Sequence, residues 1–327
     1  MSFANLTRFA ALDVPVTDPN GCAMVLVVVK GTFDPSGKLL GERAPIWAVD
    51  VPWDPDAADG SVRFPSDLAL AKAGADVVVV GSARSRRPVK VQDLVVRVAD
   101  RRLHLRVHGE RVFYRGVGGV VVGDAAPFDE KPIRYERSFG GADKRAVERR
   151  NPVGRGVADD ATTLVDKPAP QIEWGDEPVT TANGRYEPAG LGAIPAHWMP
   201  RAGYAGTCDE GWQSERMPIM PEDFDLRFYR CAHPRLQLDR MISPGMAVGV
   251  DGMNVEGPLA VTVAPLDVTI TGVFDDGSRQ DVVPAVDTLI IDTDGLRVML
   301  AARASFPLGR GKRRLRALRV EPHGGQA

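Results

Sequence analysis

Several features that would place a protein in a common class are missing from this chain. It has 41 basic and 43 acidic residues and a formal net charge of −2, so no excess of positive charge predicts binding to nucleic acid. No apolar run approaches the roughly 18 residues of a membrane-spanning helix. The first residues lack the charged start and apolar stretch of a secretory signal peptide. We therefore expect a cytoplasmic protein that binds neither nucleic acid nor membrane.

Cysteine and clustered metal ligands are also scarce. The three cysteines are Cys22, Cys208 and Cys231. They are far apart, which fits a reducing compartment better than a disulfide framework. His233 follows Cys231 closely, but this spacing is a weak sign of a metal site. His104 and His108 lie four residues apart on an expected strand, which separates them by about 13 Å, too far to share one ion. We predict no metal site.

The usual catalytic motifs are absent as well. The glycine-rich stretch 116–123 matches neither a dinucleotide-binding fingerprint nor a P-loop, and no helix pattern follows it. There is no Gly-x-Ser-x-Gly nucleophile elbow. The acidic residues are scattered and single out no carboxylate pair. We predict no cofactor and no catalytic residue, and we expect the protein to act by binding another protein.

The clearest patterns present are those of β-strands. Residues 24–33 are rich in β-branched side chains and apolar on both faces, which predicts a central strand ending at a turn. In residues 103–107, Leu and Val alternate with His and Arg, which predicts a strand with one buried face. Gly109 and Glu110 then predict a hairpin into residues 111–115. Similar strand patterns are found in residues 267–274, 287–291 and 296–306.

These patterns predict a mostly β protein in three parts. Residues 1–123 and 236–327 are expected to form an N-terminal and a C-terminal β unit, each sandwich-like. Residues 124–235 are rich in Pro, Gly, Arg and aromatic residues and show little periodicity. A structureless loop of that length is uncommon in a compact domain, and the stretch is too aromatic for a disordered linker. We expect an ordered irregular segment over the β core, with one short helix near residues 143–150.

Two further patterns leave alternatives open. Residues 25–33 resemble residues 298–306, each a long strand that ends in Phe before a Gly/Pro turn. Two similar β units would explain this, and so would chance, because strands share a restricted alphabet. The basic run between residues 310 and 319 is expected to be a solvated tail or edge strand, with a partner-binding patch as the alternative.

The middle segment interleaves arginines with aromatic residues. Such side chains form stacked pairs, buried ion pairs or interface anchors. Alternatively, they tie an irregular loop to the core by bonding its carbonyl groups. Both interpretations stay open. The candidate partner-binding residues are Arg134, Tyr135, Glu136, Arg137, Phe139, Trp198, Arg201, Trp212, Arg216, Phe224 and Asp225.

The ordered series of motifs resembles a bacterial family, domain-of-unknown-function family 2169, whose genes typically lie beside type VI secretion spike, tip and effector genes. The motifs occupy residues 26–34, 63–68, 134–141, 151–154, 192–201, 204–209, 218–228 and 289–293. Cys208 departs from the family pattern, where a Tyr is expected, and residues 231–258 diverge from it.

The resemblance implies a cytoplasmic adaptor or chaperone-like protein without catalytic activity. Such a protein would bind a secreted effector and help to load it on the spike, so its partners would be the effector and a spike or tip protein. The competing hypothesis is a hydrolase acting on carbohydrate or peptide, with Glu136 or Asp225 in a site of the middle segment. A third possibility is a structural piece of the secretion apparatus.

Overall fold

The computed structural model of the chain describes residues 1–57, 59–310 and 313–324. Most of its regular structure is β-strand, and α1 (Glu210–Glu215) is the one α-helix of the described residues. The prediction of a mostly β protein is confirmed. Within the described ranges, no helix is both long and apolar enough to cross a membrane.

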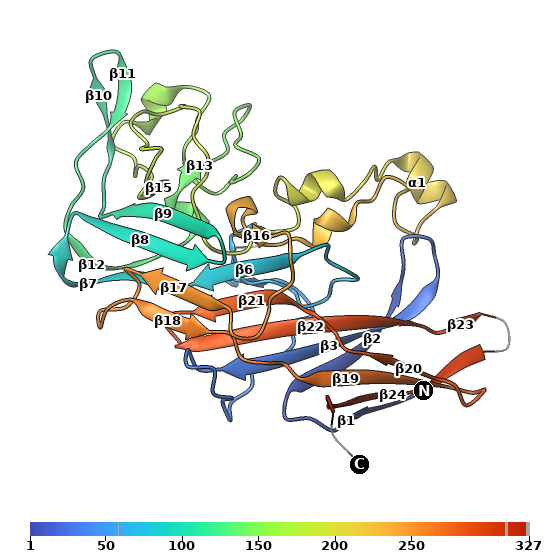
Figure 1. Ribbon diagram of the computed structural model, residues 1–327. Helices are drawn as coiled ribbons and strands as arrows, with labels where there is room; N and C mark the ends of the chain where they lie inside the picture. The colour runs from blue at the N-terminus through green and yellow to red at the C-terminus, as the bar shows by residue number, and fades with distance from the viewer. Residues whose placement is uncertain (58, 311–312, 325–327) are drawn as a thin grey trace.

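A six-stranded sheet forms the centre of the molecule (Figure 1). Its strands, in order across the sheet, are β16 (Gln237–Leu238), β6 (Ala75–Val80), β21 (Val286–Asp292), β22 (Arg297–Pro307), β3 (Ala23–Phe33) and β2 (Ala10–Thr17). Neighbouring strands run antiparallel except β6 and β21, which are parallel. β6 and β21 are buried on both faces, as are most of β3 and β22. This explains why their sequences are apolar without alternation.

The central sheet combines both ends of the chain. β3 pairs along its length with β22, so that Val25 lies opposite Phe306 and Phe33 opposite Val298. The two stretches with similar sequences are therefore neighbouring strands. Because each is apolar on both faces, each needs an inner position in a covered sheet. The two ends of the chain share one sheet instead of forming two separate sandwich-like units.

A second sheet packs against one face of the central sheet and forms the lower layer in Figure 1. Its strands are β1 (Ser2–Asn5), β24 (Arg313–Pro322), β19 (Val268–Phe274) and β20 (Arg279–Val282), with β23 (Gly309–Arg310) paired to β24. Ile270 and Leu318 of this sheet belong to the same buried cluster as Val27 and Phe306 of the central sheet. The two sheets therefore enclose one hydrophobic core.

The part of the basic run from residue 313 to residue 319 lies on β24, which is an inner strand of the second sheet and not an edge strand. Arg314, Arg316 and Arg319 are exposed, whereas Leu315 points into the core. The side chains of residues 310–313 lie outside the described part of the structure.

A third sheet contains the predicted half-buried strand. Its order is β15 (Ile172–Trp174), β9 (Arg101–His108), β8 (Val91–Val98), β17 (Ala247–Asp251) and β18 (Leu259–Thr262). On β9, Leu103, Leu105 and Val107 are buried, as their alternation with polar residues predicts.

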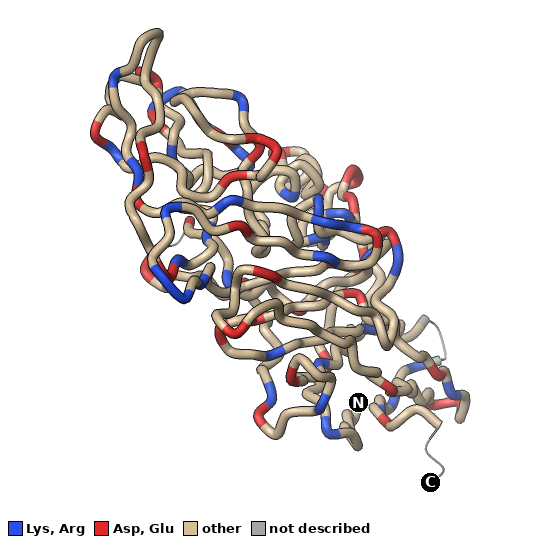
Figure 2. The backbone as a smooth tube through the Cα atoms, turned by 60° about the vertical axis from the view of Figure 1, so that its left-hand side comes forward, with Lys and Arg blue, Asp and Glu red and all other residues tan. Residues whose placement is uncertain are grey.

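The hairpin predicted at Gly109 is wrong. β9 pairs with β8 and β15, while β10 (Phe113–Gly116) and β11 (Gly119–Val122) form their own hairpin, which projects from the body (Figures 1 and 2). The N–H of Gly109 donates to the Lys90 carbonyl (3.1 Å), so it extends the β8–β9 pairing. A Cβ at Gly109 would lie 1.7 Å from the Ala126 carbonyl oxygen. A glycine is therefore required here because the backbone of Ala126 comes so close, and not because the chain turns.

The irregular middle segment is ordered and lies over the other face of the central sheet (Figure 1). Its short elements are η1 (Tyr135–Arg137), β13 (Phe139–Gly140), β14 (Arg155–Gly156), η2 (Ala161–Leu164), η3 (Arg201–Tyr204), α1, η4 (Leu226–Tyr229) and, just beyond it, η5 (Pro234–Leu236). Two strand pairs complete the fold: β4 (Val51–Pro52) with β5 (Val62–Phe64), and β7 (Ser82–Val89) with β12 (Phe128–Pro132).

The helix predicted near residues 143–150 is wrong. Ala142 and Val147 form an isolated bridge, and the N–H of Gly141 donates to the Asn151 carbonyl (2.9 Å). The buried side chain of Asn151 donates to the carbonyls of Tyr135 (2.8 Å) and Phe139 (2.9 Å). Side-chain bonds to the backbone thus replace regular structure in this stretch.

Candidate functional site

A loop projects from the middle segment and is here called the arm, residues 205–225. It begins after η3 and ends before η4, and the N–H of Asp225 donates to the carbonyl of Tyr204 (3.0 Å), so the two ends of the arm meet. The arm carries α1, whose N-terminus is capped by Asp209 through a bond from the Trp212 N–H (2.8 Å). In Figure 1 it lies above the connection between β2 and β3.

The arm touches this β2–β3 connection. The guanidinium of Arg216 donates to the carbonyl of Pro19 (3.1 Å). A Cβ at Gly21 would lie only 2.8 Å from the side chain of Ile219, so the two segments are in close contact. The indole N–H of Trp212 donates to the Ile219 carbonyl (2.8 Å) and fixes the fold of the arm at this contact. Trp212 and Arg216, two of the predicted partner-binding residues, thus hold the arm in place.

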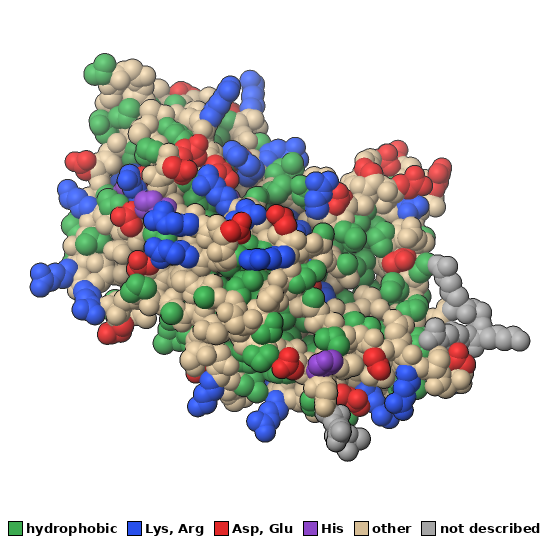
Figure 3. Space-filling model, in the orientation of Figure 1, with side chains coloured by type: hydrophobic (Ala, Val, Ile, Leu, Met, Phe, Trp, Pro, Cys, Tyr) green, Lys and Arg blue, Asp and Glu red, His purple; other side chains and the backbone are tan. Residues whose placement is uncertain are grey.

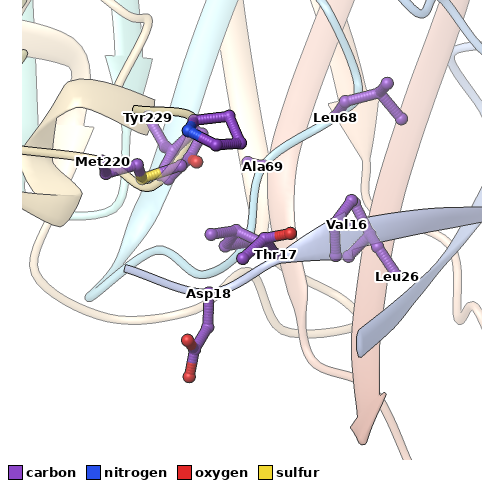
Figure 4. A pocket seen from close by; sticks show the side chains of 10 residues that line it. Val16, Thr17, Asp18, Leu26, Leu68, Ala69, Met220 and Tyr229 are labelled. Carbon is purple, nitrogen blue, oxygen red and sulfur yellow. The ribbon is translucent and has the colours of Figure 1, made fainter. Parts of the chain in front are cut away.

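Between the arm, β2, β3 and the residues before β6 lies a cavity of about 310 Å³, here called the groove (Figure 4). Seven of its ten lining residues are apolar. The lining consists of Val16, Thr17, Asp18, Leu26, Leu68, Ala69, Leu70, Pro218, Met220 and Tyr229. The carboxylate of Asp18 accepts the N–H groups of Asn20 (2.9 Å) and Cys22 (2.7 Å) and points away from the other lining residues in Figure 4. The groove therefore offers apolar contact.

The arm is strongly acidic. Residues 205–225 contain six acidic residues and one arginine. Acidic side chains gather on it at the upper right of Figure 3. Bonds from the backbone N–H and the hydroxyl of Thr207 lower the pKa of Asp223, and the bond from Arg227 lowers the pKa of Asp225. Both carboxylates are therefore charged at neutral pH. A second hollow of about 520 Å³ on the arm is lined in part by Glu215, Glu222 and Asp223.

The base of the arm is an aromatic cluster. The ring of Phe224 lies 5.6 Å from that of Phe228 and 5.8 Å from that of Tyr229, measured between centroids. Arg201 donates to the carbonyls of Phe228 (2.9 Å) and Ile194 (2.7 Å). Burial raises the pKa of Tyr229 to about 12, so its hydroxyl stays neutral beside the groove.

Four of the predicted partner-binding residues are buried: Tyr135, Phe139, Trp198 and Arg201. The rings of Tyr135 and Trp198 meet edge to face at 5.7 Å, and burial raises the pKa of Tyr135. Phe139 meets Tyr186 in the same way at 5.1 Å. These side chains fasten the irregular segment to the core, which is the second of the two interpretations open at the sequence level.

Three further candidates lie near the buried ones and are partly exposed. The guanidinium of Arg134 lies over the ring of Trp53 at 4.5 Å. The carboxylate of Glu136 accepts the N–H (2.8 Å) and hydroxyl (2.7 Å) of Ser61. Arg137 donates to the side chain of Gln171 (2.8 Å).

The carboxylates named by the hydrolase hypothesis, Glu136 and Asp225, are each bonded within their own neighbourhood. Glu136 is held by Ser61, and Asp225 forms an ion pair with Arg227 at 2.6 Å. The hydrolase hypothesis stays a prediction that no contact of these two residues favours.

Sequence reasoning missed a stack of cations and aromatic rings around β4 and β5. It runs through Lys30, Trp47, Phe64, Arg63, Trp53 and Arg134. The ammonium of Lys30 lies 3.2 Å from the centre of the Trp47 ring, which stacks on Phe64 at 4.4 Å. Arg63 lies between the rings of Phe64 (5.1 Å) and Trp53 (5.0 Å). Cation–π contacts of this kind fasten the loop around β4 and β5 to the central sheet.

It also missed four buried ion pairs, three between the central sheet and the segments that cover it and one between two strands of that sheet. These pairs are Lys30–Asp67, Lys72–Asp76, Arg230–Asp76 and Arg303–Asp287. Burial, the largest influence, lowers the pKa of Lys30 to about 8. Burial opposes the charge on Asp76, but Lys72 and Arg230 overcome it and lower the pKa of that carboxyl. The sequence did contain a signal for these pairs, because a charged residue inside an apolar strand needs a buried partner. Lys30, which follows five valines and leucines, is an example.

No metal centre is found in the part of the chain that the structure describes, since no three potential ligands come together there. His104 bonds to Asp93 (2.8 Å) and His108 to Glu173 (2.8 Å). The thiol of Cys231 is buried, and burial raises its pKa to about 12.

Comparison with known proteins gives a family without a known activity. A family model described as an uncharacterized protein conserved in bacteria (DUF2169) matches residues 20–303. No curated protein and no solved structure matches the chain.

Proposed function

The chain belongs to the DUF2169 family of uncharacterized bacterial proteins, and from this premise we propose that it is an adaptor, or chaperone-like protein. It holds an effector of a type VI secretion system in the cytoplasm and helps to load it on the spike. The observation that supports this proposal is the apolar groove beneath the arm. Contiguous apolar surface open to solvent typically marks a contact site, because covering it releases ordered water.

The form of the groove favours a protein partner over a small substrate. Small-molecule sites combine apolar walls with a few polar groups aimed at the ligand. Here the one charged lining residue, Asp18, is bonded to its own turn. Met217, next in sequence to the lining residue Pro218, exposes 62% of its surface and adds further apolar surface on the arm.

One side of the groove is formed by a strand that is held in place by both of its neighbours. Leu26 belongs to β3, which is paired on both sides within the central sheet. On the same strand, Lys30 is fixed by Asp67 (2.7 Å) and by the Trp47 ring. A surface that is already ordered loses little conformational entropy when a partner binds, which favours affinity.

Complex formation with the products of the neighbouring effector and spike genes tests the proposal. The purified chain should co-elute with the effector on gel filtration and should be recovered with it in a pull-down. If the chain is recovered alone and its elution does not change when the effector and spike proteins are added, the adaptor function is contradicted. Abundance in the secreted fraction would instead indicate a structural piece of the apparatus.

A further inference from the structure

We propose that the groove receives one bulky apolar side chain from a segment of the effector whose neighbouring residues are lysine or arginine. This inference rests on the proposed function and adds the chemistry of the segment that is bound. It follows from an apolar cavity and an acidic arm that lie side by side.

The size and lining of the groove suit a single large side chain. Its volume of about 310 Å³ is at the lower end of ligand sites, which is too small for a folded element. Leu68 and Pro218 supply apolar surface, and Met220 supplies a flexible side chain that adapts to different shapes. The neutral hydroxyl of Tyr229 adds no charge.

The charge of the arm selects the residues that flank this side chain. Glu215 and Glu222 are exposed, and the Glu222 side chain keeps 87% of its surface in solvent. Arg216 is the one cation within residues 205–225; it donates to the carbonyls of Pro19 and Met220 and also forms an ion pair with Glu222 at 3.5 Å. Six acidic residues against this one arginine still leave the arm with a net negative field, which attracts cationic segments and repels phosphate groups and anionic lipids.

Binding of short synthetic peptides tests the chemistry directly, with isothermal titration calorimetry as the measurement. The probe has one leucine with two lysines on each side in a Gly/Ser background. Its two matched controls replace the leucine by serine or the lysines by glutamate. We expect the leucine-to-serine change to weaken binding at least about tenfold, because the apolar contact is lost. We expect the glutamate peptide not to bind.

Variants of the full chain test whether the peptide binds in the groove. Thr17→Trp fills the groove from an exposed position on β2, and its matched control Thr262→Trp alters an exposed threonine on β18. Glu215→Lys with Glu222→Lys reverses the charge of the arm, and its control is Asp129→Lys with Glu256→Lys, two exposed acidic residues outside the arm. We expect Thr17→Trp and the arm variant each to weaken peptide binding about tenfold, with both controls unchanged. Melting temperatures check that all variants are folded.

The outcomes separate this inference from the proposed function. If the effector binds but Thr17→Trp, charge reversal of the arm and about 0.5 M salt leave its affinity unchanged, the inference is overturned and the adaptor function stands. If peptides bind while the effector does not, the adaptor function is contradicted and the inferred chemistry of the groove stands. If the chain is a dimer that Thr17→Trp dissociates, the groove holds a second copy and the inference is overturned.

Discussion

Two arginine side chains of the middle segment hold backbone carbonyls that lie far apart in the sequence. Arg201 joins the carbonyls of Ile194 and Phe228, and Arg216 joins those of Pro19 and Met220. The planar guanidinium suits this role because its donors are fixed in a fork. An irregular segment leaves many carbonyls without partners in a sheet or helix, so arginines supply the missing donors.

Glu173 predicts a pH dependence at the residue scale. Its carboxylate is buried and bonded to His108 (2.8 Å) and Arg111 (2.7 Å). Burial opposes its charge, but these two partners lower its pKa to about 2 from an ordinary 4.5. As the pH falls, the unfolded chain therefore binds the proton first, and the stability from this group is lost between about pH 4.5 and pH 2.

The change Glu173→Gln should remove this contribution. We expect the variant to be about 2 kcal/mol less stable than the unchanged protein at pH 7, with the difference shrinking as the pH falls from about 4.5. Urea unfolding of both proteins at a series of pH values measures this difference in the free energy of unfolding. A difference that stays constant down to pH 3 would contradict the assignment of the low pKa to Glu173.

At the scale of elements, buried ion pairs join strands to the segments that cover them. Asp76 of β6 accepts from Lys72 (2.7 Å), from Arg230 (3.0 Å) and from the N–H of Cys231 (2.9 Å). It thereby connects β6 with the stretch that follows η4 at the base of the arm. Removing one member of a buried pair leaves an uncompensated charge, which costs more than a surface pair contributes.

Asp76→Asn should therefore destabilise the fold by about 3 kcal/mol and loosen the base of the arm. Urea unfolding measures the first effect, and faster hydrogen exchange in residues 226–236 measures the second. The control is Asp93→Asn, an exposed aspartate on β8 that is bonded to His104. Equal stability of the Asp76 and Asp93 variants would show that the buried pairs do not hold this element.

At the scale of the whole molecule, two closely joined layers carry a projecting arm. The central and second sheets form one core from strands at both ends of the chain. The arm leaves and rejoins the body at one point, where Tyr204 and Asp225 are bonded at 3.0 Å. A loop whose ends already meet can be shortened at little cost in chain entropy.

Replacing residues 206–224 by a short Gly/Ser linker should therefore leave the body folded while removing one wall of the groove. We expect an unchanged far-UV circular dichroism spectrum, and effector binding weakened at least about tenfold, measured by calorimetry. Full binding by this shortened chain would place the effector surface elsewhere, for example on the β10–β11 hairpin.

Local sequence patterns determined the strands and their faces. The alternation of Leu103, Leu105 and Val107 with polar residues, and the unbroken apolar run in β3, each predicted burial correctly because side-chain direction follows from backbone period alone. The density of aromatic residues likewise predicted that residues 124–235 are ordered.

Only the tertiary structure decided which strands pair and which polar residues are buried. The pairing of β3 with β22 joins residues far apart in the sequence, and no local pattern specifies a distant partner. The same holds for Arg201, which is buried, and for Arg134, which is partly exposed, although both lie among aromatic residues in the sequence. Their burial depends on carbonyls and rings that other segments bring to them. The groove is likewise made by β2, β3 and the arm together.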